Sequence, residues 1–434
     1  MSSKTKTTAT KEEEVPALVP KLRFPEFRGT EGWKSTRLGD LCEVITKGST
    51  PTSYGFDYVD SGVRFVKIES LSGGSVDCSK TACITDECNT SFFRSQLKEN
   101  DILFSIAGAL GVIALVERRI LPANVNQAIG IVRLKHGYSH QFLLHQLQGE
   151  LIQAEIQRIR AGAAQPNISL SQLGDFAALL PAKAEQQKIA ECLSSVDDLM
   201  SAQARKVDAL KTHKKGLMQQ LFPREGETQP RLRFPEFQNA GEWEEKNLED
   251  LAKRGSGHTP NKTTQEYYNG GIKWVSLADS KRLDNGVISD TAIEISEQGI
   301  KNSSAVLHTA GSVILSRDAG VGKSAVMSES MAVSQHFIVW TCDKNRLSNW
   351  FLYYILQIKK PVFESVASGS TIKTIGLPFF KELRITVPSI TEQQRIASCL
   401  SSLDALITLE TQKLEALKTH KKGLMQQLFP SPEE

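Results

Sequence analysis

The sequence lacks the patterns of a metal site, a disulfide framework or a membrane span. Its seven cysteines include no CxxC pair, and the even spacing of Cys78, Cys83 and Cys88 matches no zinc motif. No stretch approaches the roughly 18 consecutive apolar residues of a spanning helix, and the polar N-terminal stretch has no apolar signal-peptide core. We therefore expect a cytoplasmic protein with reduced cysteines, no metal and no membrane partner.

An excess of charge of one sign is also missing. The 52 Lys and Arg residues nearly balance the 49 Asp and Glu residues, and a net charge of +3 does not by itself indicate a polyanionic partner. It does not exclude one either, because a DNA duplex needs only one basic face. With 434 residues, 40% of them hydrophobic and 23% charged, the chain has the composition of a globular protein of two or three domains.

Motifs for catalysis are scarce and incomplete. The segment GVGKS at 320–324 ends like a phosphate-binding loop, but Arg317 occupies the position where that motif needs its first glycine. The segment DSK at 279–281 has the acid-x-Lys form of a nuclease metal site, but the aligned segment 69–71 lacks the lysine. We therefore predict no catalytic residues and no cofactor on this chain, with an ATPase at the GVGKS segment as a minor alternative.

One block of the sequence occurs twice without a change. ALKTHKKGLMQQLFP spans residues 209–223 and again 416–430. Further matched pairs are LRFPEF at 22–27 and 232–237, EQQ[KR]IA at 185–190 and 392–397, TP at 50–51 and 259–260, and Gln127 with Gln335. The chain is therefore two copies of one plan, each a variable domain followed by a nearly invariant segment.

The nearly invariant segment has the periodicity of a coiled-coil helix. Its seam residues recur at alternating steps of four and three, and the LFP ending stops each helix because proline cannot continue one. The apolar seam positions are Ile189, Leu193, Val196, Met200, Val207, Leu210, Leu217 and Leu221 in the first copy, and Ile396, Leu400, Leu403, Ile407, Leu414, Leu417, Leu424 and Leu428 in the second. Polar residues interrupt both seams at matching places, Lys214 and Lys421 among them. We expect the two helices to pack on each other, antiparallel, rather than to act as two separate core helices.

Each variable domain mixes strand-like and helical stretches. Short β-branched runs predict strands at 62–68, 101–107, 111–116 and 127–134. An apolar face at helical spacing predicts one helix over 140–161, with a counterpart over 349–367. The fold class is therefore mixed α+β, and the polar, glycine-led loops at 162–169 and 369–376 are candidate binding segments.

These features divide the chain into seven parts. They are a disordered N-terminal tail (1–20), a first variable domain (21–183), a central helix (184–223), a linker (224–230), a second variable domain (231–388), a C-terminal helix (389–430) and a short tail (431–434).

The tandem pattern resembles the specificity subunit of type I DNA restriction-modification systems. The resemblance runs from about Leu22 to Pro430 and rests on LRFPEF, the G-x-TP loop, the EQQ[KR]IA helix start and the KKGLMQQLFP ending. It implies two pseudo-symmetric target recognition domains, each reading one half of a bipartite, asymmetric site in double-stranded DNA, and two antiparallel helices that set the gap. It also implies a noncatalytic scaffold for two adenine methyltransferase (modification) subunits and for restriction subunits. S-adenosylmethionine, ATP and Mg²⁺ would be bound by those partners.

Candidate DNA contacts are polar and basic loop residues near the matched landmarks. Arg and Lys suit guanine, Asn and Gln suit adenine, and Ser, Thr and Lys suit phosphate. The candidates are Lys47, Thr50, Tyr54, Lys67, Arg94, Arg160, Gln165 and Asn167 in the first domain, and Thr259, Asn261, Lys262, Lys281, Arg282, Arg317, Ser370 and Lys373 in the second. The rival hypothesis is a two-headed coiled-coil adaptor that binds only proteins, and a DNA shift assay on the assembled complex would separate the two.

Overall fold

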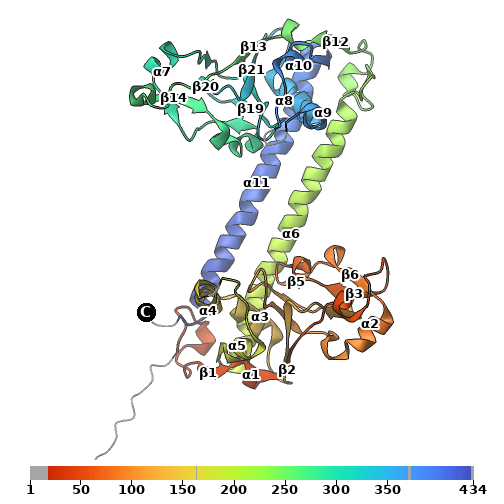
Figure 1. Cartoon of the computed structure of the whole chain (residues 1–434), viewed down its shortest axis with the longest axis vertical. Coiled ribbons are helices and arrows are strands. Elements are labelled where there is room, and N and C mark those ends of the chain that lie inside the picture. The colour runs from red at the N-terminus through yellow and green to blue at the C-terminus, as the bar shows by residue number, and fades with distance from the viewer. Residues whose placement is uncertain (1–17, 163, 370–372, 432–434) are drawn as a thin grey trace, which may run out of the picture. The chain divides into compact units, whose positions relative to one another are not determined.

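The computed structural model in Figure 1 describes residues 18–431 apart from 163 and 370–372. It divides into two compact units. Unit 1 takes the described residues up to Ala204 and from Lys413 onward, and unit 2 takes Arg205–Gln412. Each unit therefore contains one variable domain and a part of each long helix, α6 (Lys183–Leu221) and α11 (Ile390–Leu428). Among the described residues no helix is both long and apolar enough to cross a membrane.

Unit 1 combines short strands with short helices. Its strands are β1 (Lys34–Arg37), β2 (Cys42–Lys47), β3 (Val63–Val66), β4 (Leu71–Ser72), β5 (Ser75–Val76), β6 (Ala82–Ile84), β7 (Ile102–Ser105), β8 (Ile113–Leu115), β9 (Ala123–Val125), β10 (Ile129–Leu134) and β11 (Ala177–Leu180). Its short helices are α1 (Leu38–Leu41), α2 (Asp86–Ser91), α3 (His140–Gln148), α4 (Glu150–Ala161) and α5 (Leu170–Asp175). The main sheet has the order β2-β10-β7-β8, and smaller sheets have the orders β6-β3-β9, β1-β11 and β4-β5.

Unit 2 repeats this plan. Its strands are β12 (Glu244–Asn247), β13 (Ala252–Ser256), β14 (Tyr268–Val275), β15 (Val287–Ile288), β16 (Glu294–Ile295), β17 (Leu307–His308), β18 (Val313–Ser316), β19 (Ser324–Met327), β20 (Met331–Val333), β21 (Phe337–Cys342) and β22 (Arg384–Val387). Its short helices are α7 (Glu297–Lys301), α8 (Asn349–Ile358), α9 (Lys360–Val366) and α10 (Leu377–Lys381). The main sheet has the order β13-β21-β18-β19-β15, beside sheets of order β16-β14-β20-β17 and β12-β22. The mixed α+β fold predicted from the sequence is therefore confirmed.

The central strands of the main sheets are buried on both faces, which explains their near-continuous apolar sequence. In unit 1, Phe104 and Val132 belong to the core that includes residues of α3 and α4. Their chain neighbours Leu103 and Ile131 belong to a second core, shared with β3 and β9. The same division between two cores holds for β18 and β21 in unit 2.

The structure corrects the prediction of one continuous helix over 140–161. Two helices, α3 and α4, meet at Gly149, whose backbone is extended (φ −75°, ψ 171°). The predicted helix over 349–367 is likewise divided into α8 and α9, with Pro361 in the first turn of α9. Proline has no N–H to offer to the preceding turn. The prediction was wrong because the apolar face continues across both breaks, so periodicity alone hid them.

An aromatic cluster in each unit is completed by the end of a long helix that comes from the other repeat. In unit 1, Phe429 at the end of α11 lies 5.9 Å from the ring of Trp33 and 5.5 Å from that of Phe142, centroid to centroid. In unit 2, Phe222 at the end of α6 stacks on Phe351 at 5.2 Å and meets Trp243 at 6.0 Å. The identical LFP endings therefore fill equivalent sites, each in the core of the domain that the other repeat encodes.

The LRFPEF segment joins two helix termini in each unit. The guanidinium of Arg23 makes two hydrogen bonds with the carboxylate of Glu185, near the start of α6, at 2.8 and 2.7 Å. The preceding Leu22 donates its backbone N–H to Gln427 O, at the end of α11, at 2.8 Å. Unit 2 contains the same pair of contacts, Arg233 with Glu392 at 2.8 and 2.7 Å, and Leu232 N–H to Gln220 O at 2.9 Å. The repeated motif is thus a clamp between the start of one long helix and the end of the other.

The long helices run antiparallel. Within unit 2, Lys206 lies 3.1 Å from Glu410 and Lys214 lies 2.5 Å from Asp404, so increasing residue numbers on α6 face decreasing numbers on α11. Unit 1 contains the counterpart of the second pair, Lys421 with Asp197 at 2.7 Å. The lysines that interrupt the apolar seams therefore meet an aspartate on the opposite helix, and such polar pairs usually specify register.

The apolar seam positions lie in buried or half-buried surroundings. Buried are Ile189, Leu193, Val196, Val207, Leu221, Ile396, Leu400 and Leu428. Half-buried are Met200, Leu210, Leu217, Leu403, Ile407, Leu414, Leu417 and Leu424.

A buried histidine makes the seam of unit 1 sensitive to pH. His145 of α3 is 1% exposed, its Nδ1 lies 3.9 Å from Asp197, and burial lowers its pKa to about 3. In the unfolded chain the pKa of a histidine is about 6.5, so below that pH the unfolded state takes up a proton that the folded state does not. We expect unit 1 to lose about 2 kcal/mol of stability between pH 7 and pH 5 for this reason.

The second repeat provides a control for this pH-dependent loss of stability. Tyr354 stands where His145 stands in the first repeat, its hydroxyl donates to Asp404 at 2.8 Å, and burial raises its pKa, so it stays neutral over this range. His145→Tyr should therefore remove the loss between pH 7 and pH 5 in urea unfolding monitored across pH, and Tyr354→His should add one in unit 2. Parallel stability curves for wild type and His145→Tyr would contradict the assignment.

The predicted boundary between the N-terminal tail and the first variable domain, at residue 20, lies too far along the chain. Most of the predicted N-terminal tail, residues 1–17, lies outside the described residues, as do 432–434 of the C-terminal tail. Residues 18–20, assigned to the tail, belong to unit 1 instead, because Leu18 O accepts a hydrogen bond from Trp33 N at 2.7 Å and Leu18 packs against the core.

Candidate nucleic-acid interface

A three-residue turn with a central glutamine occurs at the same place in both units. In unit 1 the turn 126–128 joins β9 to β10, and in unit 2 the turn 334–336 joins β20 to β21. Each turn is closed by a backbone hydrogen bond across it, of 3.3 Å in unit 1 and 3.2 Å in unit 2. The central residues, Gln127 and Gln335, are exposed.

The G-x-TP loop packs directly on each of these turns. A Cβ atom added at Gly48 would lie 1.8 Å from Val125 O, and one at Gly257 would lie 1.6 Å from Val333 O, so only glycine permits this approach. The approach places a threonine beside the glutamine two residues beyond the valine. Thr259 Oγ1 donates to Gln335 Oε1 at 2.6 Å, and Thr50 makes the same hydrogen bond to Gln127.

Two further loops join this arrangement through backbone hydrogen bonds. In unit 1 the hairpin between β7 and β8 bonds to the glutamine turn through Ile106 N–H to Ala128 O at 2.8 Å, and Ile168 N–H bonds to Ile106 O at 2.9 Å. In unit 2 the equivalent bonds are Arg317 N–H to His336 O and Ile375 N–H to Arg317 O, both at 3.0 Å. We call these four connected loops the loop face. It comprises residues 47–54, 106–112, 126–128 and 164–169 in unit 1, and 256–264, 317–323, 334–336 and 373–376 in unit 2.

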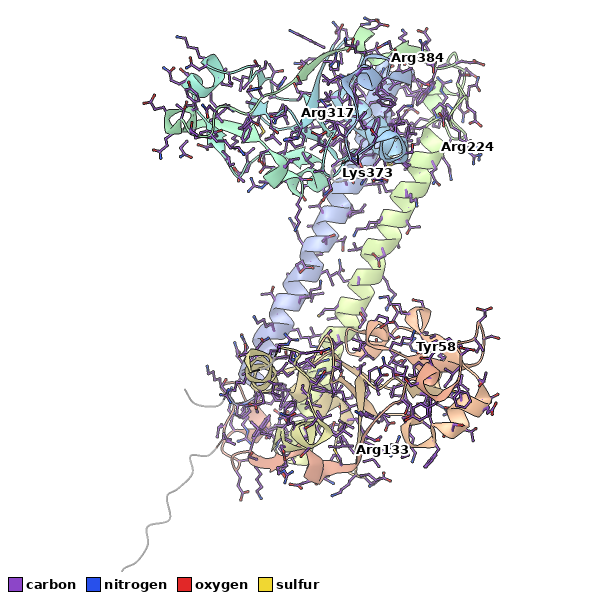
Figure 2. All side chains as sticks on the ribbon, in the orientation of Figure 1. Tyr58, Arg133, Arg224, Arg317, Lys373 and Arg384 are labelled. Carbon is purple, nitrogen blue, oxygen red and sulfur yellow. The ribbon has the colours of Figure 1, made fainter. Side chains whose placement is uncertain are left out.

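Most of the candidate DNA contacts lie on the loop face. They are Lys47, Thr50, Tyr54, Gln165 and Asn167 in unit 1, and Thr259, Asn261, Lys262, Arg317 and Lys373 in unit 2. Arg317 and Lys373 lie on neighbouring loops of unit 2, as Figure 2 shows. Arg160 lies on α4 and donates to Leu110 O, in the hairpin loop, at 3.0 Å.

The remaining candidates lie outside the loop face as defined. The ammonium of Lys67, just after β3, lies 4.3 Å from the centre of the Tyr58 ring. Arg94 is exposed on a short 3-10 helix (Phe93–Ser95). Lys281 is also exposed, and the carbonyl of the preceding residue, Ser280, accepts a hydrogen bond from Lys323 at 3.3 Å. Ser370 lies outside the described residues.

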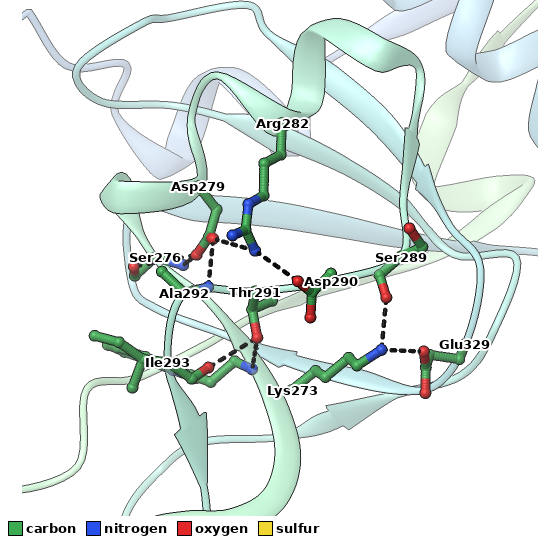
Figure 3. Close-up of polar contacts among 11 residues, drawn as sticks. Lys273, Ser276, Asp279, Arg282, Ser289, Asp290, Thr291, Ala292, Ile293 and Glu329 are labelled. Carbon is green, nitrogen blue, oxygen red and sulfur yellow. Dashed lines mark hydrogen bonds and ion pairs between the residues drawn. The ribbon is translucent and has the colours of Figure 1, made fainter.

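Arg282 and the DSK segment form a structural cluster (Figure 3). Asp279 is fully buried and accepts hydrogen bonds from Ser276 N at 3.0 Å and Ala292 N at 2.8 Å. The guanidinium of Arg282 lies 3.3 Å from Asp279 and 3.5 Å from Asp290. The carboxylate that resembled a nuclease ligand therefore holds a turn in place, and Arg282 is already engaged by two carboxylates.

The GVGKS segment forms a hairpin between β18 and β19 rather than a loop that leads into a helix. A phosphate-binding loop needs the N-terminus of a helix after it. The ammonium of Lys323 lies 2.6 Å from Asp284, so the lysine is used within the domain.

Unit 2 has a pocket of about 570 Å³ at its loop face. Trp274, Tyr268 and His336 contribute to its lining, and His336 Nδ1 lies 2.6 Å from Asp318. The hydroxyl of Ser334 also lines it, and this buried group has no hydrogen-bond partner within the described part of the chain. A pocket that combines aromatic side chains with a few hydrogen-bonding groups is typical of a ligand-binding site.

Several residues that shape the loop face and the clamps were absent from the sequence-based candidates. The repeat aligns Gln127 and Gln335 as residues of matching strands, with either a structural role or a DNA contact, and they were not among the candidate DNA contacts. The structure places both in turns, before β10 and β21. The clamp residues Arg23 and Glu185 lie in repeated blocks, so the repeat marked them as well. Periodicity could not show that they meet.

Comparison with known protein families identifies the family to which this chain belongs. The family model for the type I restriction modification DNA specificity domain matches the chain twice, over residues 30–212 and 240–419. The chain belongs to this family. The two matches fall on the two repeats, so each variable domain with its long helix is one copy of the specificity domain.

Known relatives agree with the family assignment, in one case over nearly the whole chain and in another over part of it. The type I restriction enzyme MjaVIII specificity subunit of Methanocaldococcus jannaschii is 22% identical over 424 residues, which cover 94% of this chain and 95% of that protein. The MjaIX specificity subunit of the same organism is 28% identical over 181 residues, 41% of each protein. The crystal structure of a type I restriction-modification system S subunit from M. genitalium shares the fold, with a TM-score of 0.59, 16% identity and coverage of 95% of this chain and 100% of that one.

Proposed function

We propose that this specificity protein reads a bipartite, asymmetric DNA sequence, one half with each loop face. The observation that carries the proposal is the pair of loop faces, which share one backbone framework and differ in nearly all their exposed side chains. Thr50 and Thr259 are alike, whereas Pro166-Asn167 in the first face corresponds to Lys373-Thr374 in the second. Side chains on base edges carry sequence information, so unlike faces should select unlike half-sites.

The antiparallel helices would then set the gap between the half-sites. A continuous 39-residue helix in each repeat supports a rigid spacer, because its length at about 1.5 Å per residue is fixed by the backbone. The lysine–aspartate pairs on the seam support a single register. A gap of fixed length is therefore expected in the recognised sequence.

The chain would also act as a noncatalytic scaffold. Two adenine methyltransferase subunits would dock on it by the pseudo-symmetry of the two repeats, and restriction subunits would join them. S-adenosylmethionine, ATP and Mg²⁺ would bind to those partners, which supply the chemistry. We place the complex in the cytoplasm, where its DNA substrate lies.

The test is to co-express the chain with its methyltransferase subunit and map N6-methyladenine over a host genome by single-molecule sequencing. We expect one bipartite asymmetric motif with a fixed gap and one modified adenine in each half. Exchanging Asn261 and Lys262 for alanine should relax only one half, and exchanging Gln165 and Asn167 for alanine only the other, because each pair lies on one loop face. A properly assembled complex that modifies no motif would favour the protein-binding adaptor.

A further inference from the structure

One side-chain arrangement is the same on two loop faces that otherwise differ. The Gly-x-Thr-Pro loop and the glutamine of the turn occur in both, whereas the residues beside the glutamine are Asn126 and Ala128 in unit 1 and Ser334 and His336 in unit 2. The glutamine therefore keeps its identity at a position whose neighbours have changed. A function common to both faces would explain this.

The hydrogen bond from the threonine fixes the direction of the glutamine amide. In both units the threonine hydroxyl donates to the carbonyl oxygen Oε1, so Oε1 faces the threonine and the Nε2 amide group faces away from it. Both glutamines are exposed. Within the described part of unit 1, Nε2 of Gln127 has no hydrogen-bond partner. In unit 2, Nε2 of Gln335 makes a long hydrogen bond of 3.5 Å with His336 Nε2, which leaves its second N–H for another acceptor. Each loop face thus presents a pre-oriented hydrogen-bond donor.

Holding the loop in place does not require this donor. Gly48 and Gly257 already bring the loop against the strand end, and His258 N–H bonds to Val333 O at 3.1 Å. The exposed amide is therefore available for a ligand.

We propose that Gln127 and Gln335 each donate to a phosphate oxygen of the DNA backbone, and that Thr50 and Thr259 are positioning residues for them. The inference rests on the proposed function. If the two faces read unlike half-sites, a contact that both faces keep should go to a feature that both half-sites share, and the phosphate backbone is such a feature. Phosphate oxygens accept hydrogen bonds, which suits a side chain that offers its N–H groups.

Reading of an adenine base common to both half-sites is the competing contact. A glutamine reads adenine with both ends of its amide, donating to N7 and accepting from N6. Here Oε1 is turned toward the threonine, so only the Nε2 end of the amide faces away from the loop, where a ligand could meet it. The geometry therefore favours the donor-only contact with phosphate.

The experiment uses the full chain assembled with its methyltransferase subunits and short duplexes that carry the mapped motif. Gln335→Ala should weaken binding about tenfold, by an equal factor for cognate and non-cognate duplexes, because a hydrogen bond to a charged group is lost. Gln335→Glu keeps the shape and can still accept from Thr259, but it should weaken binding further through repulsion. Thr259→Val should resemble Gln335→Ala, whereas Thr259→Ser keeps the hydroxyl and should bind like wild type. Gln127 and Thr50 provide the matched set in the other half.

Duplexes with single methylphosphonates then locate the contact. We expect wild type to lose affinity at one phosphate of the half-site, and Gln335→Ala to be insensitive at that phosphate alone. The proposal is overturned if Gln335→Ala binds like wild type, or if its loss occurs only with cognate DNA and is reproduced in wild type by 7-deaza-adenine in the motif. A wild-type complex that binds no sequence selectively would instead contradict the proposed function itself, so the two failures are distinguishable.

Discussion

Replacing Glu185 with alanine should destabilise unit 1 by about 3–5 kcal/mol, because the guanidinium of Arg23 would be left buried without its charge partner. The Arg23 side chain is 7% exposed and that of Glu185 is 1% exposed. Two nearly parallel hydrogen bonds, of 2.8 and 2.7 Å, join them. The loss would also release the LRFPEF segment from the start of α6, so local unfolding should begin there.

A double substitution tests whether the cost comes from the stranded charge. Arg23→Met with Glu185→Met replaces both partners by apolar side chains of similar length, and we expect it to recover most of the stability in urea unfolding. In unit 2, Glu392→Ala and the double exchange with Arg233 form a matched set, because the side chain of Arg233 is 12% exposed and that of Glu392 is 1% exposed. A double variant as unstable as the single one would show that the clamp depends on the hydrogen bonds themselves.

Phe429→Ala should destabilise unit 1 by about 3 kcal/mol, although Phe429 lies close to the end of the 434-residue sequence, where substitutions usually cost little. Phe429 is 8% exposed and its ring packs against Trp33 and Phe142, so removal of the ring leaves a cavity in that core. Phe222→Ala should have the equivalent effect on unit 2, through Trp243 and Phe351.

Hydrogen–deuterium exchange followed by mass spectrometry assigns each effect to a unit. We expect faster exchange around α3 and Trp33 in Phe429→Ala, and around α8 and Trp243 in Phe222→Ala. Phe429→Leu is the control, because a smaller change in volume should cost less. Faster exchange of unit 2 in Phe429→Ala, with unit 1 unaffected, would contradict the placement of this helix end.

The repeat could be recognised in the sequence because it depends on identity alone, and much of the fold followed from it. The strand at 127–134 was expected from its β-branched run, and the structure has β10 there at Ile129–Leu134. The helix over 140–161 was not expected to break, since the apolar face is continuous. Gly149 adopts an extended backbone in which α3 and α4 can both pack on the sheet, and that preference comes from tertiary contacts rather than from local periodicity.

The candidate site was predictable only in part. The sequence selects the G-x-TP loop and the two glycine-led loops as neighbours of matched landmarks, and the structure places them in one connected loop face, but their mutual contact was not visible in the sequence. Thr259 and Gln335 are 76 residues apart in the chain, and their hydrogen bond exists because Gly257 lets a loop lie against the end of β20. Lys281 and Arg282 looked equally available from the sequence, yet two carboxylates engage Arg282 in the folded domain.

The sequence by itself determined that two copies of one domain alternate with two helices of coiled-coil periodicity, because spacing, proline stops and repetition are properties of the chain. Only the tertiary structure decided which core each helix end enters. The endings at Phe222 and Phe429 are identical, so no local preference distinguishes packing in the domain of the same repeat from packing in the other. Each helix end enters the domain of the other repeat because α6 and α11 pair antiparallel. In this pairing Lys214 meets Asp404, 190 residues away, and such a long-range partner is determined by tertiary contacts rather than by local sequence.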